Sequence, residues 1–303
     1  MRCSIAAIQA LAMHPVYRQR DGIMEEAMDI AESLFKKKLD CSFLVEMPAE
    51  NVRAILEPEI GRLIKTQRPT GMWKIKDSRR ITYWLLKALK HSGYLESLLE
   101  EEHFRRDPFL SFRDDHDYYG LVVRRNVMEA SLPGDAKLRE ELVSGIFADQ
   151  DAEGSWNGTV ISTSNQMETL MELGIGLDDR RVEKSAGWLL SMCAEDVYRL
   201  SGNMGGFLVA HNMFSSQDRA SEFKNALAEK PEWNPVRLCY VHLPMIQTGA
   251  ALRALIRLGL ENDGRVIAAC DNLLELRQNY GGWCDSNIRS GLIAKKKAGK
   301  LST

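Results

Sequence analysis

The sequence predicts an all-α protein, a single domain over residues 1–303 in which helical hairpins stack and close into an α/α toroid. Two observations predict this fold. Apolar residues recur at helical spacing, and nothing alternates convincingly at the two-residue period of a β-strand. A phrase made of an amphipathic helix, a glutamine, a glycine and an aromatic residue also recurs along the chain, which indicates a repeat architecture.

The recurring phrase ends in Gly-x-Trp in its three clear copies. They are Ile60–Trp73, Leu142–Trp156 and Asp271–Trp283, with Gln67, Gln150 and Gln278 lying six, six and five residues before the tryptophan. A weaker fourth copy, Ala186–Phe207, keeps two glycines and the aromatic residue but lacks the glutamine. We interpret these residues as structural: the glycine turn lets the tryptophan lie back over a helix end, where the glutamine amide satisfies exposed backbone groups.

A second helix follows each Gly-aromatic turn and closes on a glycine. These helices are predicted at Arg80–Gly93, Ser162–Gly174 and, after an insertion at about residues 210–235, at His242–Gly259. The closing glycine is typical of a helix C-terminus, because few other residues fit a positive φ cheaply. A helical hairpin cannot bury its apolar stripe alone, so neighbouring hairpins must share a core.

Five further helices complete the predicted ring. They are Ser4–Met13, Ile23–Lys38, Glu50–Lys65, Tyr118–Ser131 and Ala136–Phe147. The total of about twelve helices makes about six hairpins, and closing them into a ring removes the exposed end faces that an open solenoid must cap.

Composition narrows the function classes. The chain is 45% hydrophobic and 27% charged, as expected of a globular protein with a large core. Its net charge of -2 provides no basic field for nucleic acid, and we interpret the basic run at about residues 294–303 as a solvated tail. Six scattered cysteines favour a reducing cytoplasm over a disulfide-bonded secreted domain. We also expect no transmembrane segment, since no stretch approaches the ~18 apolar residues that one needs.

The Gln-x(3–5)-Gly-x-Trp phrase resembles the QW repeat of squalene and hopene cyclases, which is shared more loosely by the β subunits of protein prenyltransferases. The resemblance covers about residues 60–93 and 136–285. It implies the α/α toroid of the terpenoid cyclase and prenyltransferase superfamily, with a central cavity that binds an isoprenoid or another hydrophobic molecule. It also implies a helical protein partner, because the prenyltransferase β subunits work with one.

Candidate chemistry is expected where the inner helices begin, because their N-termini gather at one rim and favour anions such as a diphosphate. Asp114, Asp115 and Asp117 precede the helix predicted at Tyr118. Class II cyclases place an acidic Asp-x-Asp-Asp motif there as a proton donor, although the order of the carboxyls differs here, and the magnesium-binding Asp-Asp-x-x-Asp of class I synthases is not matched. We predict these three residues as catalytic, with acidic capping of the helix as the alternative.

A second candidate site combines sulfur and imidazole groups. Cys239 and His242 lead into the last predicted helix, and Asp285 follows the last Gly-Gly-Trp. Prenyltransferase β subunits bind zinc through Asp, Cys and His, so the resemblance implies zinc at Cys239, His242 and Asp285. The spacing differs from the family's, whose Asp-x-Cys has no counterpart after Phe207, and a free cysteine is commonly a small core residue.

The resemblance and the candidate residues lead to two hypotheses about function. One is an enzyme that cyclises or transfers an isoprenoid. The other is a lipid-binding or scaffold toroid without catalysis that acts with a partner subunit. It is favoured by the lack of a full catalytic motif and by only 8% aromatic residues, since cavities that guide carbocations are rich in aromatic faces. Carbohydrate-active α/α barrels also use carboxylate pairs in a central cavity, but the QW phrase is not theirs.

Overall fold

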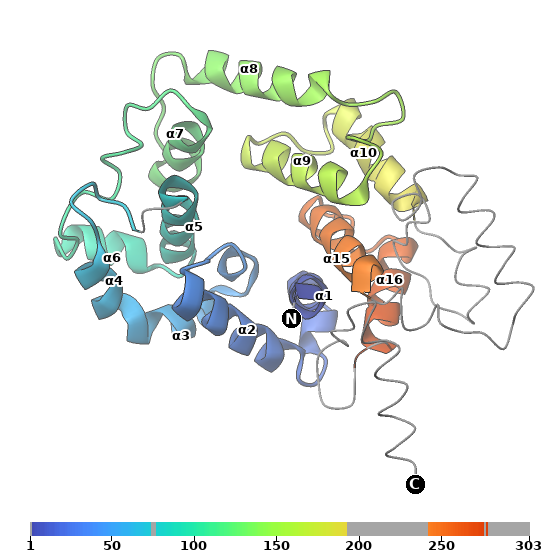
Figure 1. Cartoon of the computed structure of the whole chain (residues 1–303), viewed down its shortest axis with the longest axis horizontal. Coiled ribbons are helices and arrows are strands. Elements are labelled where there is room, and N and C mark those ends of the chain that lie inside the picture. Colours follow the sequence, from blue (N-terminus) through green and yellow to red (C-terminus); the bar gives the residue numbers. More distant parts are fainter. Residues whose placement is uncertain (1, 74–76, 193–241, 276, 278–303) are drawn as a thin grey trace, which may run out of the picture. The chain divides into compact units, whose positions relative to one another are not determined.

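The computed structural model describes residues 2–73, 77–192, 242–275 and 277 (Figure 1). Over these residues the chain is helical and has no β-strand, and an isolated antiparallel bridge joins Gln150 to Trp156. The prediction of an all-α protein is therefore confirmed. No helix in the described part of the chain is long and apolar enough to cross a membrane.

The chain divides into two compact units. The terminal unit combines Met1–Glu26 with Asp149–Thr303, and the central unit is Ala27–Ala148. The helix α2 (Ile23–Lys38) carries the chain from the first into the second. The closure of all hairpins into one ring stays a prediction.

The terminal unit is built around α1, which is buried along most of its length. Its helices are α1 (Arg2–Met13), α9 (Val160–Glu172), α10 (Arg180–Ser191), α15 (His242–Arg257) and α16 (Gly264–Glu275), with a 3-10 turn at Tyr17–Gln19. The helix α1 packs against α15, and α15 packs against α9 (Figure 1). Gly249 permits the first contact, because a Cβ there would lie 2.4 Å from the carbonyl oxygen of Ala6.

Two ion pairs show that α9 and α15 run in the same direction. Arg253 pairs with Glu168 at 2.7 Å, and one turn later Arg257 pairs with Glu172 at 2.5 Å. A step of four residues toward the C-terminus on α15 thus matches a step of four residues toward the C-terminus on α9, so the two helices are parallel. Gly249 of α15 lies against Ala6 of α1, and one turn later Arg253 donates a hydrogen bond of 2.7 Å to Gln9. The contacts move toward the C-terminus on both helices, so α1 is parallel to α15 and to α9. Equivalent helices of stacked helical hairpins run parallel, and these three helices do so.

The turn after α1 is fixed to α16 and to the residues before it. The Tyr17 hydroxyl lies 2.5 Å from Asp271 Oδ1 and 3.1 Å from the Ile267 carbonyl oxygen. Burial and the neighbouring Asp271 raise the pKa of Tyr17, so the phenol stays a neutral donor. His14 Nδ1 accepts from a backbone N–H at 3.2 Å, which leaves Nε2 to donate to the Glu261 carbonyl oxygen at 3.0 Å.

The central unit also contains two parallel helices. Its elements after α2 are α3 (Ala49–Leu56), α4 (Ile60–Thr66), α5 (Ser78–His91), α6 (Tyr94–Glu100), α7 (Tyr118–Val123), a π-helix (Arg124–Met128) and α8 (Asp135–Ala148), with 3-10 turns at Leu44–Glu46 and Glu57–Glu59. Arg79 at the start of α5 pairs with Asp117 before α7 at 2.8 Å. Lys90 at the end of α5 donates to the Val127 carbonyl oxygen at 2.9 Å, so α5 and α7 advance together.

The first Gln-Gly-Trp phrase forms a buried knot of hydrogen bonds. Gln67 Nε2 donates to the carbonyl oxygens of Gly71 at 3.0 Å and Arg106 at 2.8 Å, and Gln67 Oε1 accepts from the Arg106 N–H at 3.0 Å. Trp73 is buried, and its indole N–H donates to a carbonyl of α4 at 2.8 Å. Its backbone N–H donates to Thr82 of α5 at 3.2 Å. The knot thus ties α4 to the following helix and to a later loop.

The second phrase repeats this geometry in the terminal unit. Gln150 Nε2 lies 3.3 Å from the carbonyl oxygen of Gly154, again four residues on, and 3.1 Å from that of Arg181 in α10. Trp156 is buried, and its backbone N–H donates to Thr163 of α9 at 3.1 Å. The structural interpretation of the phrase is therefore confirmed for two copies, while Gln278 and Trp283 of the third copy lie outside the described residues.

Helix ends match the sequence where a glycine marks them. Gly93, Gly174 and Gly259 have φ values of 76°, 73° and 82°, as their predicted place after a helix requires. The helix predicted at Glu50–Lys65 is instead divided into α3 and α4 by the Glu57–Glu59 turn, which contains a proline. The helix predicted at Tyr118–Ser131 continues as a π-helix after Val123.

Gly71 and Gly93 offer a matched test of the knot. Both have a positive φ, but a Cβ at Gly71 would lie 2.2 Å from the Asp107 carbonyl oxygen, whereas nothing lies within 4 Å of one at Gly93. We expect Gly93→Ala to lower the free energy of unfolding by about 1–2 kcal/mol for its left-handed backbone. Gly71→Ala should cost about 2 kcal/mol more because the backbones must separate. Urea denaturation measures both, and equal costs would contradict the close approach.

Candidate functional site

The predicted catalytic carboxyls meet an arginine from the preceding helix. Arg79 Nη2 donates to Asp117 Oδ1 at 2.8 Å, and Arg79 Nη1 pairs with Asp115. The side chains of Asp115 and Asp117 are 46% and 50% exposed, and Asp114 is exposed. The structure therefore brings two of the three predicted residues together on one guanidinium.

Asp117 also caps α7. Its Oδ1 accepts the backbone N–H of Gly120 at 2.8 Å, which satisfies a donor at the start of the helix. Both carboxylates thus already hold partners, Asp115 on Arg79 and Asp117 on Arg79 and the helix. This arrangement matches the capping alternative, and the catalytic role of Asp114, Asp115 and Asp117 stays a prediction.

Arg79 is the site residue that the sequence interpretation missed. Its guanidinium lies over the ring of Phe112 at 5.2 Å, and its Nε is buried without a hydrogen-bond partner in the described part of the chain. Its position carried a usable signal, because it follows the first Gly-Trp turn at the start of α5, where an inner helix of the predicted ring would begin. Its pairing with Asp115 and Asp117, which lie 36 and 38 positions later, could not be predicted from its place in the sequence.

A buried ion pair holds the backbone of the acidic segment. Arg124 is 1% exposed and pairs with Asp135 through Nε at 2.9 Å and Nη2 at 2.5 Å. Arg124 Nη1 donates to the carbonyl oxygens of Phe112 at 2.7 Å and Asp115 at 2.8 Å. Gly120 allows this segment to lie close to α7, because a Cβ there would be 2.3 Å from the Asp115 carbonyl oxygen.

The predicted zinc ligands lie mostly beyond the described residues. His242 is the first residue of α15, whereas Cys239 and Asp285 lie outside the described part of the chain. Among the residues that the structure describes, no group of three or more His, Cys, Asp or Glu side chains could hold a metal ion. The zinc site at Cys239, His242 and Asp285 therefore stays a prediction.

Two of the cysteines that the structure describes, Cys41 and Cys270, are core residues. Both are buried, and neither forms a disulfide with another described residue. Burial raises the pKa of the Cys270 thiol to about 12, so it carries almost no thiolate at neutral pH. This agrees with the general behaviour of cysteine, which outside a disulfide is commonly a small core residue.

Asp135→Asn tests how far the buried pair supports the central unit. Its hydrogen bond from Arg124 lowers the pKa of Asp135, so the carboxylate stabilises the fold above the unfolded-chain pKa of about 3.9. At pH 7 the substitution leaves the Arg124 charge without its anion, and we expect the free energy of unfolding to fall by about 3 kcal/mol. The difference should shrink as the pH falls below about 4, because the Asp135 carboxyl of the unfolded chain is then protonated first and that of the folded chain follows at lower pH.

Asp263→Asn is the matched control for that experiment. Asp263 also pairs with an arginine, Arg265, at 2.8 Å, and its pKa is also lowered, but the Arg265 side chain is 48% exposed. The exposed pair should contribute less than about 1 kcal/mol. Similar losses for Asp135→Asn and Asp263→Asn, measured by denaturation from pH 3 to pH 8, would show that burial of the Arg124 pair adds nothing.

Comparisons with known proteins found no relative of this chain. No family model matches the chain, and no curated protein and no solved structure matches it either.

Proposed function

We propose that the chain is an α/α toroid of the terpenoid cyclase and prenyltransferase type, whose central cavity binds an isoprenoid or another hydrophobic molecule. The observation that carries the proposal is the Gln-Gly-Trp knot, in which the amide nitrogens of Gln67 and Gln150 each lie within hydrogen-bond distance of the carbonyl oxygen four residues on and of a second carbonyl oxygen later in the chain. A phrase that forms one knot twice is a structural repeat. The parallel pairs α5 with α7 and α9 with α15 are the inner helices that this type of repeat needs.

Contacts between the two ends of the chain support closure of the proposed ring. Within the terminal unit, α1 packs along α15, and the turn after α1 is held to α16 through Tyr17 and Asp271. An open solenoid would leave its first helix without a neighbour from the last repeat. In the proposal, α1 takes its place beside α15 as the helix that completes the ring.

Two modes of action fit this ring. In the enzymatic mode, the charged head of the ligand lies at the rim where α5 and α7 begin, and Asp114, Asp115 and Asp117 act on the apolar part. In the binding mode, the ring holds a lipid-like molecule, with or without a partner subunit, and performs no chemistry. The pairing of Asp115 and Asp117 with Arg79 favours the binding mode, because a proton donor needs a carboxyl that an ion pair has not engaged.

Product analysis tests the enzymatic mode. Wild-type protein is incubated with farnesyl diphosphate, geranylgeranyl diphosphate and squalene, and the extracts are examined by mass spectrometry. The enzymatic mode predicts a cyclised or transferred product that Asp115→Asn abolishes. Asp179→Asn is the matched control and should leave the product unchanged, because Asp179 also caps a helix and pairs with an arginine, but at α10.

The absence of any product would exclude the enzymatic mode for these substrates. Native mass spectrometry of the purified protein then tests the binding mode, which predicts a bound lipid-like molecule or uptake of one of the three compounds. A ligand-free protein that takes up none of them would contradict the proposed function as a whole.

Metal analysis tests the resemblance to prenyltransferase β subunits. If that resemblance extends to the metal, the purified protein contains one zinc ion per chain, and His242→Ala removes it because an imidazole ligand is lost. His103→Ala serves as the control, since His103 is an exposed histidine whose Nε2 lies 2.5 Å from a carboxylate oxygen of Glu101. Protein without zinc, or zinc that survives His242→Ala, would rule out the predicted site.

A further inference from the structure

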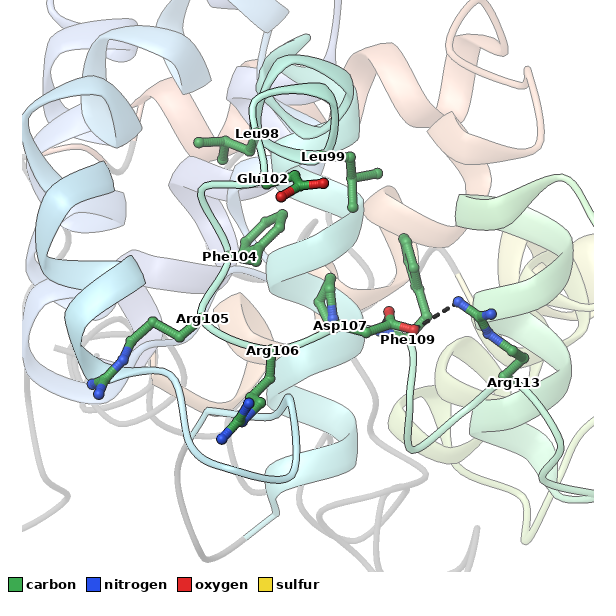
Figure 2. Close-up of a pocket in the computed structure, with 10 residues that line it drawn as sticks. Leu98, Leu99, Glu102, Phe104, Arg105, Arg106, Asp107, Phe109 and Arg113 are labelled. Atoms are coloured by element: carbon green, nitrogen blue, oxygen red, sulfur yellow. Dashed lines mark hydrogen bonds and ion pairs between the residues drawn. The ribbon is translucent and has the colours of Figure 1, made fainter.

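A pocket of about 570 Å³ opens in the central unit, between the end of α6 and the loop that follows it (Figure 2). All of its lining residues lie between positions 98 and 113. Its volume falls in the range of about 300–1,000 Å³ that is usual for small-molecule sites. It uses none of the predicted catalytic or zinc-binding residues, so it is a separate candidate site.

One side of the pocket is apolar and well supported. Leu98 and Leu99 come from α6, and Phe104 and Phe109 come from the loop. Leu99 is 39% exposed, so its side chain is accessible from solvent. The Phe104 ring packs edge-on against Trp73 with 6.0 Å between ring centroids, and Trp73 is itself fixed by the first knot. The wall is therefore formed before any ligand arrives.

The opposite side carries arginines. Figure 2 shows the side chains of Arg105 and Arg106 on the side of the loop away from the α6 leucines. Arg105 donates to a backbone carbonyl oxygen of α4 at 3.0 Å, and Arg113 pairs with Asp107 at 2.6 Å. The Arg106 guanidinium has no partner among the residues that the structure describes. With respect to the described residues, Arg106 is therefore the cation of the pocket that is available to a ligand.

The first knot holds Arg106 in place. Both backbone polar groups of Arg106 are hydrogen-bonded to the amide of Gln67, the N–H at 3.0 Å and the carbonyl oxygen at 2.8 Å. The main chain is thus rigid at the residue whose side chain is uncommitted. A fixed backbone lowers the entropy that is lost when the guanidinium binds an anion.

Glu102 gives the pocket a polarity. Its carboxylate lies on the α6 side near Leu98 and Leu99, across the pocket from Arg105 and Arg106 (Figure 2). A ligand anion is repelled from the Glu102 end and attracted to the Arg106 end. An apolar body attached to that anion would extend between Phe104 and Leu99.

We propose that this pocket binds a small anionic amphiphile, a molecule with a phosphate monoester or carboxylate head on an alkyl or aromatic body. The Arg106 guanidinium binds the head through paired N–H donors, whose planar geometry matches such groups. Phe104, Phe109 and Leu99 cover the body. This site goes beyond the proposed toroid function and does not depend on it.

Isothermal titration calorimetry of the full-length protein with decyl phosphate, below its micellar concentration, tests the proposal. Inorganic phosphate supplies the head without the body, and decyltrimethylammonium supplies the same chain with the opposite charge. We expect saturable binding of decyl phosphate at one site, at least about tenfold tighter than either comparison compound. Equal binding of decyltrimethylammonium, or the absence of decyl phosphate binding, would overturn the proposal.

Variants locate the binding. Arg106→Gln should weaken decyl phosphate by about tenfold, as expected for loss of a charge-assisted hydrogen bond. Lys137→Gln removes a cation on α8 whose side chain is 81% exposed and should change nothing. Leu99→Gln should weaken decyl phosphate without changing the response to inorganic phosphate, and Glu102→Gln should tighten decyl phosphate.

These variants change exposed side chains, so their melting temperatures should match that of the wild type. Undiminished binding in Arg106→Gln, or an equal loss in Lys137→Gln, would place the ligand elsewhere and overturn the proposal. The outcome is independent of the Asp115→Asn and His242→Ala experiments, because no residue is shared between the sites.

Discussion

A single buried amide at the end of α4 makes three hydrogen bonds to backbone groups, and much of the central unit depends on them. The Gln67 side chain donates a hydrogen bond to the carbonyl oxygen of Gly71 in its own turn. It also bonds to the backbone N–H and carbonyl oxygen of Arg106, which lies 39 residues later. Trp73 then covers the helix end, and α5 starts in a fixed place. The same side chain therefore sets the repeat, positions the helix that carries Arg79, and shapes the wall of the pocket.

The two candidate regions of the central unit differ in how their charges are used. At the start of α7, Arg79 forms ion pairs with two carboxylates. Arg124 pairs with Asp135 and donates hydrogen bonds to backbone carbonyls. Charges that neutralise one another in this way mainly define structure. At the pocket after α6, no residue in the described part of the chain pairs with the Arg106 guanidinium, which is the condition for recognition of an outside anion.

The sequence was most informative where structure is local. Helical periodicity, the Gln-Gly-Trp spacing and the glycines at 93, 174 and 259 each depend on neighbours within a few positions, and the corresponding features are present. The division at Glu57–Glu59 was also visible in principle, because Pro58 disfavours a continuous helix. The pairing of Arg79 with Asp115 and of Arg124 with Asp135 was not, since ion-pair partners are chosen by tertiary packing, and the short α6 gave too weak a periodic signal.

The contact between α1 and α15 has a consequence for how the chain is made. Every residue from Ala7 to Ala12 is buried, and the partner helix begins more than 200 residues later. During synthesis the first helix therefore leaves the ribosome well before the surface that shields it exists. Contacts of such long sequence separation slow folding and leave apolar surface exposed in the meantime. The terminal unit can therefore become complete only after α15 has been translated.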